Sequence, residues 1–356
     1  MGMGKGFTLP PNLDLAKLLS DGYETARKSE QPRIKISAIA NDSVATLVSF
    51  AYQFSNTPRS KAAMALICGT GCNATIPLAL SKLHPGKRPR RVKVLDDVSV
   101  DDDLKITVNT EWTIKGAAGP LHELKLITKW DSKLDSEGEV PGFQPFEYLT
   151  AGRYLGELGR IIAVDYFTIH LSVPFHSLPP KLQQRYGLST TFLGNLGPHL
   201  VATEPSIVKQ LEKELPQGDW EWTEEAAHVV YAVANAIQKR AAGLVAAAVI
   251  GLLACADEIH FAPSSSSIAN HSNGTAKTIL KTGKGELDEL MVGYTGGCIV
   301  HFQDYLSDCQ AFLDAVMEEE FGNSPKPRVV LKACHDGGMM GAGILAGTVD
   351  SIAHDT

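Results

Sequence analysis

The 356-residue sequence has few of the features that mark several classes of protein. Its six cysteines are scattered, whereas a disulfide-stapled secreted domain is shorter and denser in cysteine. The first seven residues contain no apolar signal core, and Gly6 stands where a myristoylation motif has Ser or Thr. The 33 basic residues do not outnumber the 40 acidic ones, so the chain lacks the basic excess that nucleic acid attracts. We therefore expect a cytoplasmic protein with no nucleic-acid partner.

Metal ligation and membrane insertion also have little support in the sequence. Cys68 and Cys72 have no His or second cysteine pair nearby, so we predict free buried thiols and no metal site. The most apolar run, residues 241–256, is shorter than the roughly 20 residues that a membrane-spanning helix needs. Charged residues flank this run on both sides, and Ala and Gly are frequent within it. A buried, closely packed helix is the better interpretation, and we predict no membrane span.

The features that are present predict a large globular core. Hydrophobic residues make up 44% of the chain and charged residues 21%, which excludes disorder over its whole length. The length predicts two domains or one large domain. Short β-branched runs alternate with stretches of helical periodicity, which predicts an α/β fold with a largely parallel sheet. The predicted strands are residues 34–40, 62–68, 104–109, 288–294 and 328–333, and the predicted helices are residues 44–54, 146–167, 223–256, 302–321 and 340–349.

Two details refine this prediction. Three closely spaced glycines, Gly152, Gly156 and Gly159, lower the helix propensity of residues 146–167, so we expect them to mark a tight helix crossing. Residues 263–286 are rich in Ser, Asn and Gly, and we expect them to form a surface loop.

Polar and small residues follow four of the predicted strands, where α/β proteins bind their ligands. These strand ends are Asn41-Asp42, Gly69 to Asn73, Asn109 to Glu111, and Gly293 to Gly297. Asp42 or Ser43 can be the N-cap of the following helix, and Asp42 can alternatively be a general base. The turn Gly69-Thr70-Gly71 permits a phosphate to approach backbone N–H groups, although it is neither a Walker A loop nor a dinucleotide motif.

Two carboxylates, Glu111 and Glu147, lie at element boundaries. A carboxylate accepts hydrogen bonds from two sugar hydroxyls at once, but it can equally be part of a solvated surface. The sequence by itself leaves both interpretations open.

Taken together, these motifs resemble the hexokinase family of sugar kinases within the actin-like ATPase superfamily. Lys5-Gly6-Phe7 is similar to the end of the family's Thr-Lys-Gly-Phe sugar loop, and Ala40 to Val44 to its Val-Asn-Asp-Thr-Val segment. Residues 69–74 resemble its second phosphate loop, and residues 109–112 carry its sugar-binding Glu. Residues 141–157 resemble a Pro-Gly…Phe-Glu…Ser-Gly-Met-Tyr-Leu-Gly-Glu signature, in which Arg153 stands at the Met; Gly293 to Val300 and Asp336 to Gly343 resemble the adenosine-holding segments.

The resemblance implies an actin-like ATPase fold of the ribonuclease H-like kind. It implies a truncated small lobe at residues 1–42, a nearly complete large lobe at 43–335, and a C-terminal nucleotide-site segment at 336–356. It also implies transfer of the ATP γ-phosphoryl group to the 6-hydroxyl of a hexose or hexosamine, with Mg²⁺ bound through the nucleotide. Asp42 would then be the catalytic base. The implied sugar ligands are Lys5, Asn41, Asn73, Glu111 and Glu147, and the implied nucleotide ligands are Gly69, Thr70, Gly71, Thr190, Gly296 and Gly337.

The sequence departs from the family pattern in several places. It contains neither an Asp-Leu-Gly-Gly-Thr phosphate loop nor a Ser-Phe-Pro sugar loop. Thr295-Gly296-Gly297 replaces Asp-Gly-Ser/Thr, and Met339 replaces a Gly, where we expect it to crowd the nucleotide. The altered residues 113–116 border the sugar and, with the Tyr-Thr-Gly-Gly segment, resemble fungal N-acetylglucosamine kinases and atypical hexokinase-like proteins. Two alternatives to an active kinase remain: a catalytically impaired regulator or sugar sensor with unidentified protein partners, and an N-terminally truncated gene model.

Overall fold

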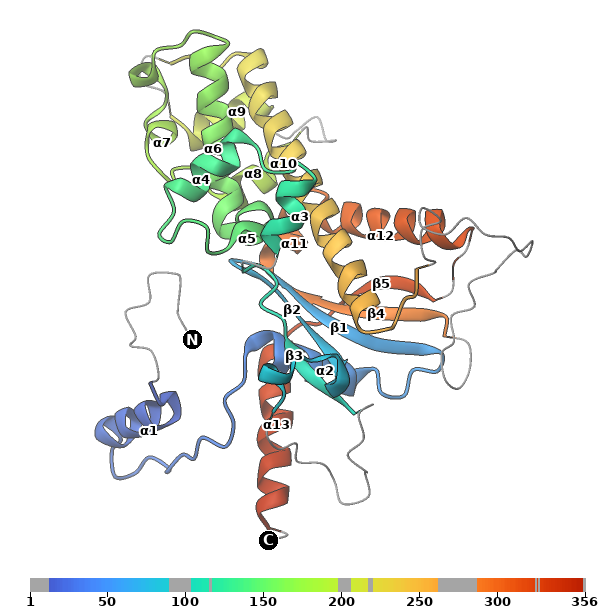
Figure 1. Cartoon of the computed structure of the whole chain (residues 1–356). Coiled ribbons are helices and arrows are strands. Elements are labelled where there is room, and N and C mark those ends of the chain that lie inside the picture. Colours follow the sequence, from blue (N-terminus) through green and yellow to red (C-terminus); the bar gives the residue numbers. More distant parts are fainter. Residues whose placement is uncertain are drawn as a thin grey trace, which may run out of the picture.

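The computed structural model describes residues 13–89, 104–114, 117–197, 206–216, 220–261, 287–323, 325 and 327–354, and it places helices on both sides of one sheet (Figure 1). The strands are β1 Ser60–Cys68, β2 Cys72–Ala79, β3 Lys105–Asn109, β4 Glu289–Thr295 and β5 Arg328–Ala333. The α-helices are α1 Leu15–Ala26, α2 Asp42–Gln53, α3 Ala118–Glu123, α4 Lys129–Ser136, α5 Pro145–Thr150, α6 Gly152–Ile169, α7 Pro180–Gln183, α8 Thr190–Asn195, α9 Ile207–Glu214, α10 Glu224–Cys255, α11 Gly297–His301, α12 Tyr305–Phe321 and α13 Gly337–His354. Short 3₁₀ turns cover Leu80–Lys82, Pro85–Lys87 and Phe175–Ser177.

The sheet has the strand order β3-β2-β1-β4-β5, and β2 runs against both of its neighbours. The pairs β1–β4 and β4–β5 are parallel. The expectation of a largely parallel sheet is therefore wrong for two of the four strand pairs. The three residues between β1 and β2 can only reverse the chain into an antiparallel pair, in which Cys68 faces Cys72. This strand order and the single reversed strand agree with a ribonuclease H-like sheet.

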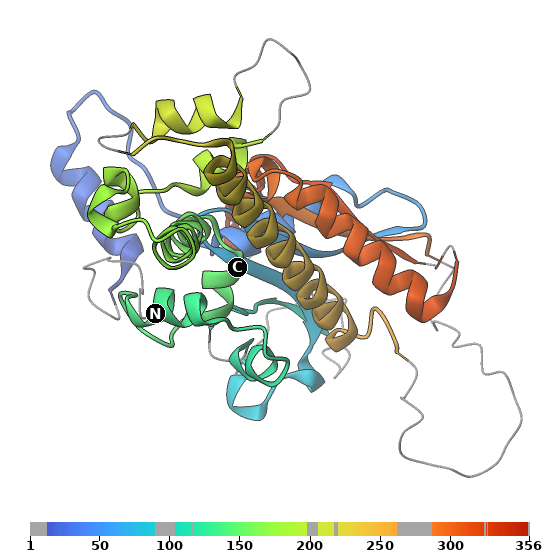
Figure 2. The same cartoon turned by 90° about the horizontal axis from the view of Figure 1, so that it is seen from above.

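Different helices cover the two faces of the sheet. Helix α2 lies against β1 and β2 on one face, and α13 packs on α2. The crossing of α2 and α13 is close because two glycines of α13 carry no Cβ. A Cβ on Gly337 would lie 3.2 Å from Thr46 Cα, and a Cβ on Gly341 would collide with the Ala45 carbonyl. On the other face α12 packs against β5, and α10 runs beside α12 (Figure 2).

Two of the predicted elements differ from the structure. Residues 34–40 are an extended segment outside the five-stranded sheet, and Ile34 and Ile39 are exposed, so the strand predicted there is wrong. The predicted helix 146–167 is two helices, α5 and α6, separated at Ala151, whose ψ is 147°. The chain breaks there because the first N–H groups of α6 donate to the β1–β2 turn, as described below. Three boundaries also shift: the predicted helix 302–321 begins at Tyr305 after the separate helix α11, and α13 extends the predicted 340–349 at both ends.

The apolar run of residues 241–256 forms most of the second half of α10, as predicted. By length and composition α10 is the one helix in the described part of the chain that could cross a membrane. Half of its most apolar 18-residue window is buried against other parts of the fold. Buried residues along it include Ala242, Val245 and Val249, which belong to the main core. The predicted loop 263–286 lies outside the described residues.

Candidate functional site

The N-terminus of α2 presents an exposed carboxylate at the end of the sheet. Asn41 is the N-cap, because the Ser43 N–H and Ser43 Oγ both donate to Asn41 Oδ1, at 3.0 and 2.6 Å. The predicted cap at Asp42 or Ser43 is thus wrong by one or two residues. Asp42 is the first residue of the helix and accepts a 2.8 Å hydrogen bond from the Ser43 N–H at one oxygen. Because Asn41 caps the helix, most of the Asp42 carboxylate remains accessible to solvent.

Side chains from α2, β2 and β3 form a hydrogen-bonded group beside Asp42, which we call the amide cluster: Asn41, Ser43, Asn73, Thr75, Asn109 and Glu111. Asn73 Nδ2 donates to Asn109 Oδ1 at 2.7 Å, and Asn109 Nδ2 donates to Glu111 Oε1 at 2.8 Å. Ser43 Oγ lies 2.5 Å from Thr75 Oγ1 and ties the cluster to α2. The structure therefore brings together three predicted sugar ligands, Asn41, Asn73 and Glu111.

The backbone of Glu111 is unusual. Its φ of 46° lies in the left-handed region, which a residue other than Gly adopts at a cost of about 1–3 kcal/mol. The hydrogen bond from Asn109 helps to hold the Glu111 carboxylate in this position. A strained residue that is held in place by a polar network is typical of a binding site.

The second predicted carboxylate, Glu147, is buried close to the amide cluster. It lies in the first turn of α5, and its side chain is 3% exposed. The Cys72 N–H, next to Asn73, donates to Glu147 Oε2 at 3.2 Å. The Glu147 carboxylate therefore contacts the start of β2, one residue before Asn73. Its burial argues against the surface-charge interpretation.

The β1–β2 turn, Gly69-Thr70-Gly71, is held by backbone contacts. The Gly152 N–H donates to the Gly69 carbonyl at 2.8 Å, and the Arg153 N–H donates to the Thr70 carbonyl at 3.2 Å. A Cβ on Gly152 would lie 2.8 Å from the same Gly69 oxygen, so only Gly permits this approach. Gly296 has a φ of 123°, and a Cβ there would collide with the Cys68 carbonyl. Three segments thus meet at the turn almost without side chains.

Buried free cysteines lie beneath this turn. Cys68, Cys72 and Cys298 are all buried, as predicted for free thiols. The neighbouring Cys298 thiol and burial raise the pKa of Cys68 well above its usual value. Burial, together with Cys68, does the same to the pKa of Cys72. Cys68 and Cys72 are therefore uncharged near neutral pH and do not repel an anion bound at the turn.

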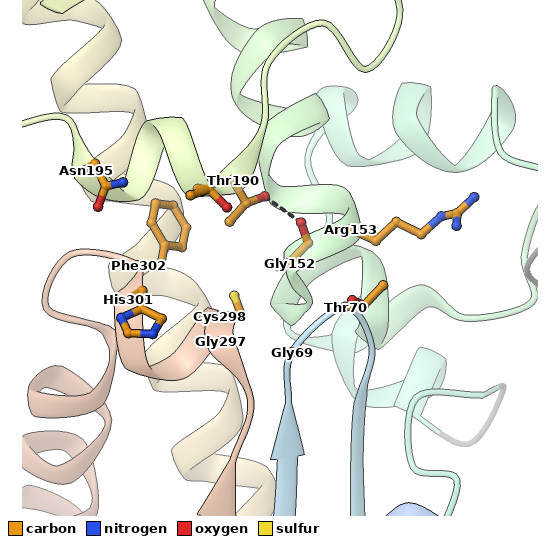
Figure 3. A pocket seen from close by; sticks show the side chains of 11 residues that line it. Gly69, Thr70, Gly152, Arg153, Thr190, Asn195, Gly297, Cys298, His301 and Phe302 are labelled. Carbon is orange, nitrogen blue, oxygen red and sulfur yellow. Dashed lines mark hydrogen bonds between the residues drawn. The ribbon is translucent and has the colours of Figure 1, made fainter.

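A cavity of about 490 Å³ opens beside the turn (Figure 3). This volume lies within the range of about 300–1,000 Å³ that small-molecule sites occupy. Three predicted nucleotide ligands line it, namely Gly69, Thr70 and Thr190. Four further lining residues lie in segments that the resemblance had marked: Gly152 and Arg153 in the 141–157 signature, and Gly297 and Cys298 in the segment 293–300. Sequence analysis missed the other four, which come from α8 and from the end of α11: Thr191, Asn195, His301 and Phe302. No Asp or Glu is among the lining residues, so the cavity suits an anion.

The Thr190 hydroxyl also holds two helices together. It donates to the Gly152 carbonyl at 2.6 Å and accepts from the Gly156 N–H at 2.7 Å (Figure 3). A Cβ on Gly156 would lie 2.5 Å from the Thr190 nitrogen, and a Cβ on Gly159 would lie 2.5 Å from Leu193 Cδ1. The predicted tight crossing at these glycines is confirmed, and it is the crossing of α6 with α8.

The remaining predicted ligands lie elsewhere. Gly71 is in the turn and Gly296 is next to Gly297, but neither lines the cavity. Gly337 faces Thr46 of α2 and the Cys334 sulfur, and it does not line the cavity either. Met339 was expected to crowd the nucleotide, but its side chain is 74% exposed on α13 and away from the cavity lining. Lys5 lies outside the described residues.

The described residues contain no group of three or more His, Cys, Asp or Glu side chains that could hold a metal ion. The cavity is lined instead by two threonines besides Thr190, namely Thr70 and Thr191, and by one arginine, Arg153. Mg²⁺ in proteins is usually held by one or two carboxylates together with substrate phosphates and waters. The residues present therefore fit an Mg²⁺ ion that arrives on phosphate groups, and they do not form a dedicated protein site.

Comparison with known proteins gives consistent results. The sequence model of the hexokinase family matches residues 63–348. Hexokinase-1 of Oryza sativa subsp. japonica is 26% identical over 325 residues, which cover 88% of this chain and 53% of that protein. Hexokinase-1 of Saccharomyces cerevisiae is 32% identical over 190 residues, which cover 53% of this chain and 35% of that protein. The chain thus spans about half the length, or less, of these curated relatives.

The fold is similar to that of solved hexokinase structures. The structure of Schistosoma mansoni hexokinase complexed with glucose has a TM-score of 0.63 and 24% sequence identity, and the match covers 87% of this chain and 57% of that chain. A second hexokinase crystal structure has a TM-score of 0.62 at 20% identity and covers 93% of this chain. The sheet and its helices therefore have the actin-like ATPase fold of hexokinases.

Proposed function

Because the chain belongs to the hexokinase family, we propose that it transfers the γ-phosphoryl group of ATP to the 6-hydroxyl of a hexose or hexosamine in the cytoplasm. One observation supports this proposal above the others. A single hairpin carries residues of both candidate regions: Thr70 lines the cavity, and Asn73, three residues later, belongs to the amide cluster. A phosphate donor and a polyhydroxyl acceptor bound in these two places would be neighbours.

The amide cluster has the chemistry that a sugar requires. Asn41 and Asn73 carry both donors and acceptors, and Glu111 and Glu147 are strong acceptors. We propose that these four side chains bind the sugar hydroxyls, with Lys5 as a fifth ligand from outside the described residues. Such a site rejects a sugar that lacks one bonded hydroxyl, because its own polar groups would be left unpaired.

We propose that the nucleotide binds in the 490 Å³ cavity. The backbone of Gly69, Thr70 and Gly71 would face its phosphates, and Thr190 would lie along its length. Gly296 would act by allowing the turn to approach α11, and Gly337 by fixing α13 against α2. Mg²⁺, carried by the phosphates, would neutralise part of their charge.

The reaction needs one base. Asp42 would accept the proton of the sugar 6-hydroxyl. The 6-oxygen of the sugar would then form a bond to the γ-phosphorus, while the bond between the γ-phosphorus and the bridging oxygen of ADP breaks. ADP then leaves, and the proton remains on Asp42 until solvent removes it. The exposed position of Asp42 as the first residue of α2 fits this role, since its carboxylate can be reached by a bound sugar. Protein assistance in such transfers is mainly positioning and electrostatic stabilisation.

Several finer points remain proposals. The altered residues 113–116 favour a sugar preference that differs from glucose, with N-acetylglucosamine as the alternative substrate. We also propose the division into a small-lobe segment at 1–42, a large lobe at 43–335 and a C-terminal segment at 336–356. In this division the C-terminal segment holds part of the nucleotide site and a helix, α13, that returns to the small lobe.

A regulator or sugar sensor without turnover is the second candidate. It is favoured by the Thr190 hydroxyl, which already bonds to Gly152 and Gly156, and by Gly297, which offers no hydroxyl to a phosphate. Such a protein would bind the sugar through the amide cluster and would not phosphorylate it.

Transfer of labelled γ-phosphate from Mg-ATP to glucose and to N-acetylglucosamine tests the proposal. We expect Asp42→Asn to lower kcat by about 10²–10⁴-fold with little change in sugar affinity, because the change removes basicity and keeps shape. The control is Glu224→Gln, which removes an exposed carboxylate from the first turn of α10. Turnover of Asp42→Asn within tenfold of wild type would exclude Asp42 as the base. Sugar binding by folded wild type without transfer would favour the sensor.

A further inference from the structure

Arg153 gives the cavity its strongest positive charge. It is the one Lys or Arg among the cavity-lining residues, and no Asp or Glu lies among them. Its own N–H donates to the Thr70 carbonyl at 3.2 Å, so its Cα is fixed beside the turn. In the signature that residues 141–157 resemble, a Met stands at this position. The positive charge at position 153 therefore distinguishes this chain from that signature.

The guanidinium of Arg153 forms a single ion pair within the described part of the chain. Arg153 Nη2 donates to Glu139 Oε1 at 2.6 Å, and the two side chains are 31% and 47% exposed. Such exposed ion pairs contribute little to stability. Arg153 Nε is buried and has no acceptor among the described residues. Most of the five N–H donors of this side chain are thus free for a ligand.

The position of Arg153 indicates which end of the cavity would hold the phosphates of a ligand. In Figure 3 Arg153 and Thr70 lie on one side, whereas Asn195 and His301 lie at the opposite side. The guanidinium points away from Thr190 in this view, so contact with a ligand requires a rotamer change. That change breaks two weak interactions, the exposed pair with Glu139 and the cation–π contact with the Tyr154 ring, whose centroid lies 5.9 Å from the guanidinium carbon.

We propose that Arg153 binds the terminal phosphates of the nucleotide and exchanges its Glu139 partner for them. The fork of the guanidinium matches phosphate geometry, and such charge-assisted pairs are stronger than neutral hydrogen bonds. The exchange makes Glu139 a competitor for the same guanidinium. This inference rests on the proposed function only in placing a nucleotide in the cavity, and it holds for a sensor as well as for a kinase.

Binding measurements on the full-length chain test the proposal without relying on turnover. The affinities of ATP, ADP, adenosine and inorganic tripolyphosphate are measured by calorimetry for wild type, Arg153→Met, Arg153→Lys and Glu139→Gln. We expect Arg153→Met to weaken ATP binding about 10- to 100-fold, the range for loss of a hydrogen bond to a charged group, and to leave adenosine binding unchanged. Arg153→Lys is expected to retain part of the effect, and Glu139→Gln to strengthen ATP binding a few-fold.

The control is Arg328→Met, which removes another arginine from an exposed ion pair, with Asp314, outside the cavity lining. It is expected to leave all four affinities unchanged. Equal loss of ATP and adenosine binding in Arg153→Met would show a structural role and overturn the proposal, as would unchanged ATP binding. Absence of ATP binding by the wild type would overturn both this proposal and the nucleotide site. Absence of sugar phosphorylation, with the expected change in ATP binding, would contradict only the proposed activity.

Discussion

The two candidate binding regions meet at one hairpin but are built in opposite ways. The wall of the cavity at the β1–β2 turn is made by backbone, and Gly152, Gly156 and Gly296 allow its segments to approach one another. The amide cluster is made by side chains, with Asn73 and Asn109 at its centre. A region built from backbone tolerates no added atom, whereas a region built from side chains depends on each donor and acceptor. The two regions should therefore fail in different ways.

The largest effect is expected from adding a methyl group to the backbone-built region. In Gly156→Ala the new Cβ would lie 2.5 Å from both the Leu188 oxygen and the Thr190 nitrogen, so α6 and α8 must separate. We expect a loss of about 3 kcal/mol in the free energy of unfolding, measured by urea denaturation. Gly347→Ala is the matched control, since nothing lies within 4 Å of its Cβ position in α13.

The control should stabilise the protein by up to about 1 kcal/mol, because Ala favours a helix over Gly. Equal effects of the two substitutions would contradict the distinction between a backbone-built and a side-chain-built region.

A smaller effect on stability, but a selective one on binding, is expected in the amide cluster. Asn109→Ala removes the acceptor of Asn73 Nδ2 and the donor to Glu111 Oε1. We expect a loss of about 1 kcal/mol in stability and a more than tenfold loss of sugar affinity, with ATP affinity unchanged. Calorimetric titration with each ligand measures both affinities. The control is Thr107→Ala, at an exposed position of the same strand; a parallel loss of ATP affinity in Asn109→Ala would argue that the regions are not separate.

The smallest effect is expected at a buried ion-pair group that belongs to neither region. Glu258 is 7% exposed and pairs with Lys61 and Lys105 at 2.6 and 2.8 Å. Burial would raise the pKa of its carboxyl, but the hydrogen bonds from Lys105 and Lys61 outweigh burial and hold the pKa below its usual value. Because the pKa is lowered in the folded state, this contribution is full above the unfolded-state pKa of about 4.3 and is lost as pH falls further.

We expect Glu258→Gln to cost about 1 kcal/mol at pH 7, since both lysines are partly exposed, and to cost progressively less as the pH falls through the lowered pKa of Glu258. Urea unfolding of both proteins at several pH values measures the difference. A difference that does not change with pH would show that packing, and not charge, is what the substitution removes. Sugar and ATP affinities at pH 7 should stay as in wild type.

The sequence predicted four of the five strands because each is a run of apolar residues of strand length. It missed β2, in which Pro77 interrupts the strand pattern, yet β2 is paired on both sides. The strand predicted at residues 34–40 is wrong because an alternating pattern forms a strand only beside a partner strand. In the described sheet β3 and β5 are the edges, and neither pairs with this segment.

The residues of the candidate site could be predicted from the sequence where they lie just after a strand. Asn73 is the second residue of β2, just after the turn that follows the predicted strand 62–68. Glu111 lies two residues after the end of β3. Asn195 and His301, in contrast, lie at the ends of the short helices α8 and α11, and only the packing of these helices brings them to one cavity. Arg153 was visible as a departure from a familiar signature, but its place on the cavity wall depends on the break between α5 and α6.

The glycine contacts between α2 and α13 have a mechanical consequence. Where Gly337 and Gly341 touch Thr46 and Ala45, the two helix backbones leave no gap for side chains to repack. A rotation of α13 about its own axis therefore has to carry α2 with it. The second half of α13 extends away from the sheet (Figure 1). Helix α2 begins at Asp42, so a methyl group added at Gly341 would displace the helix that carries this carboxylate, although Gly341 itself is far from it in the sequence.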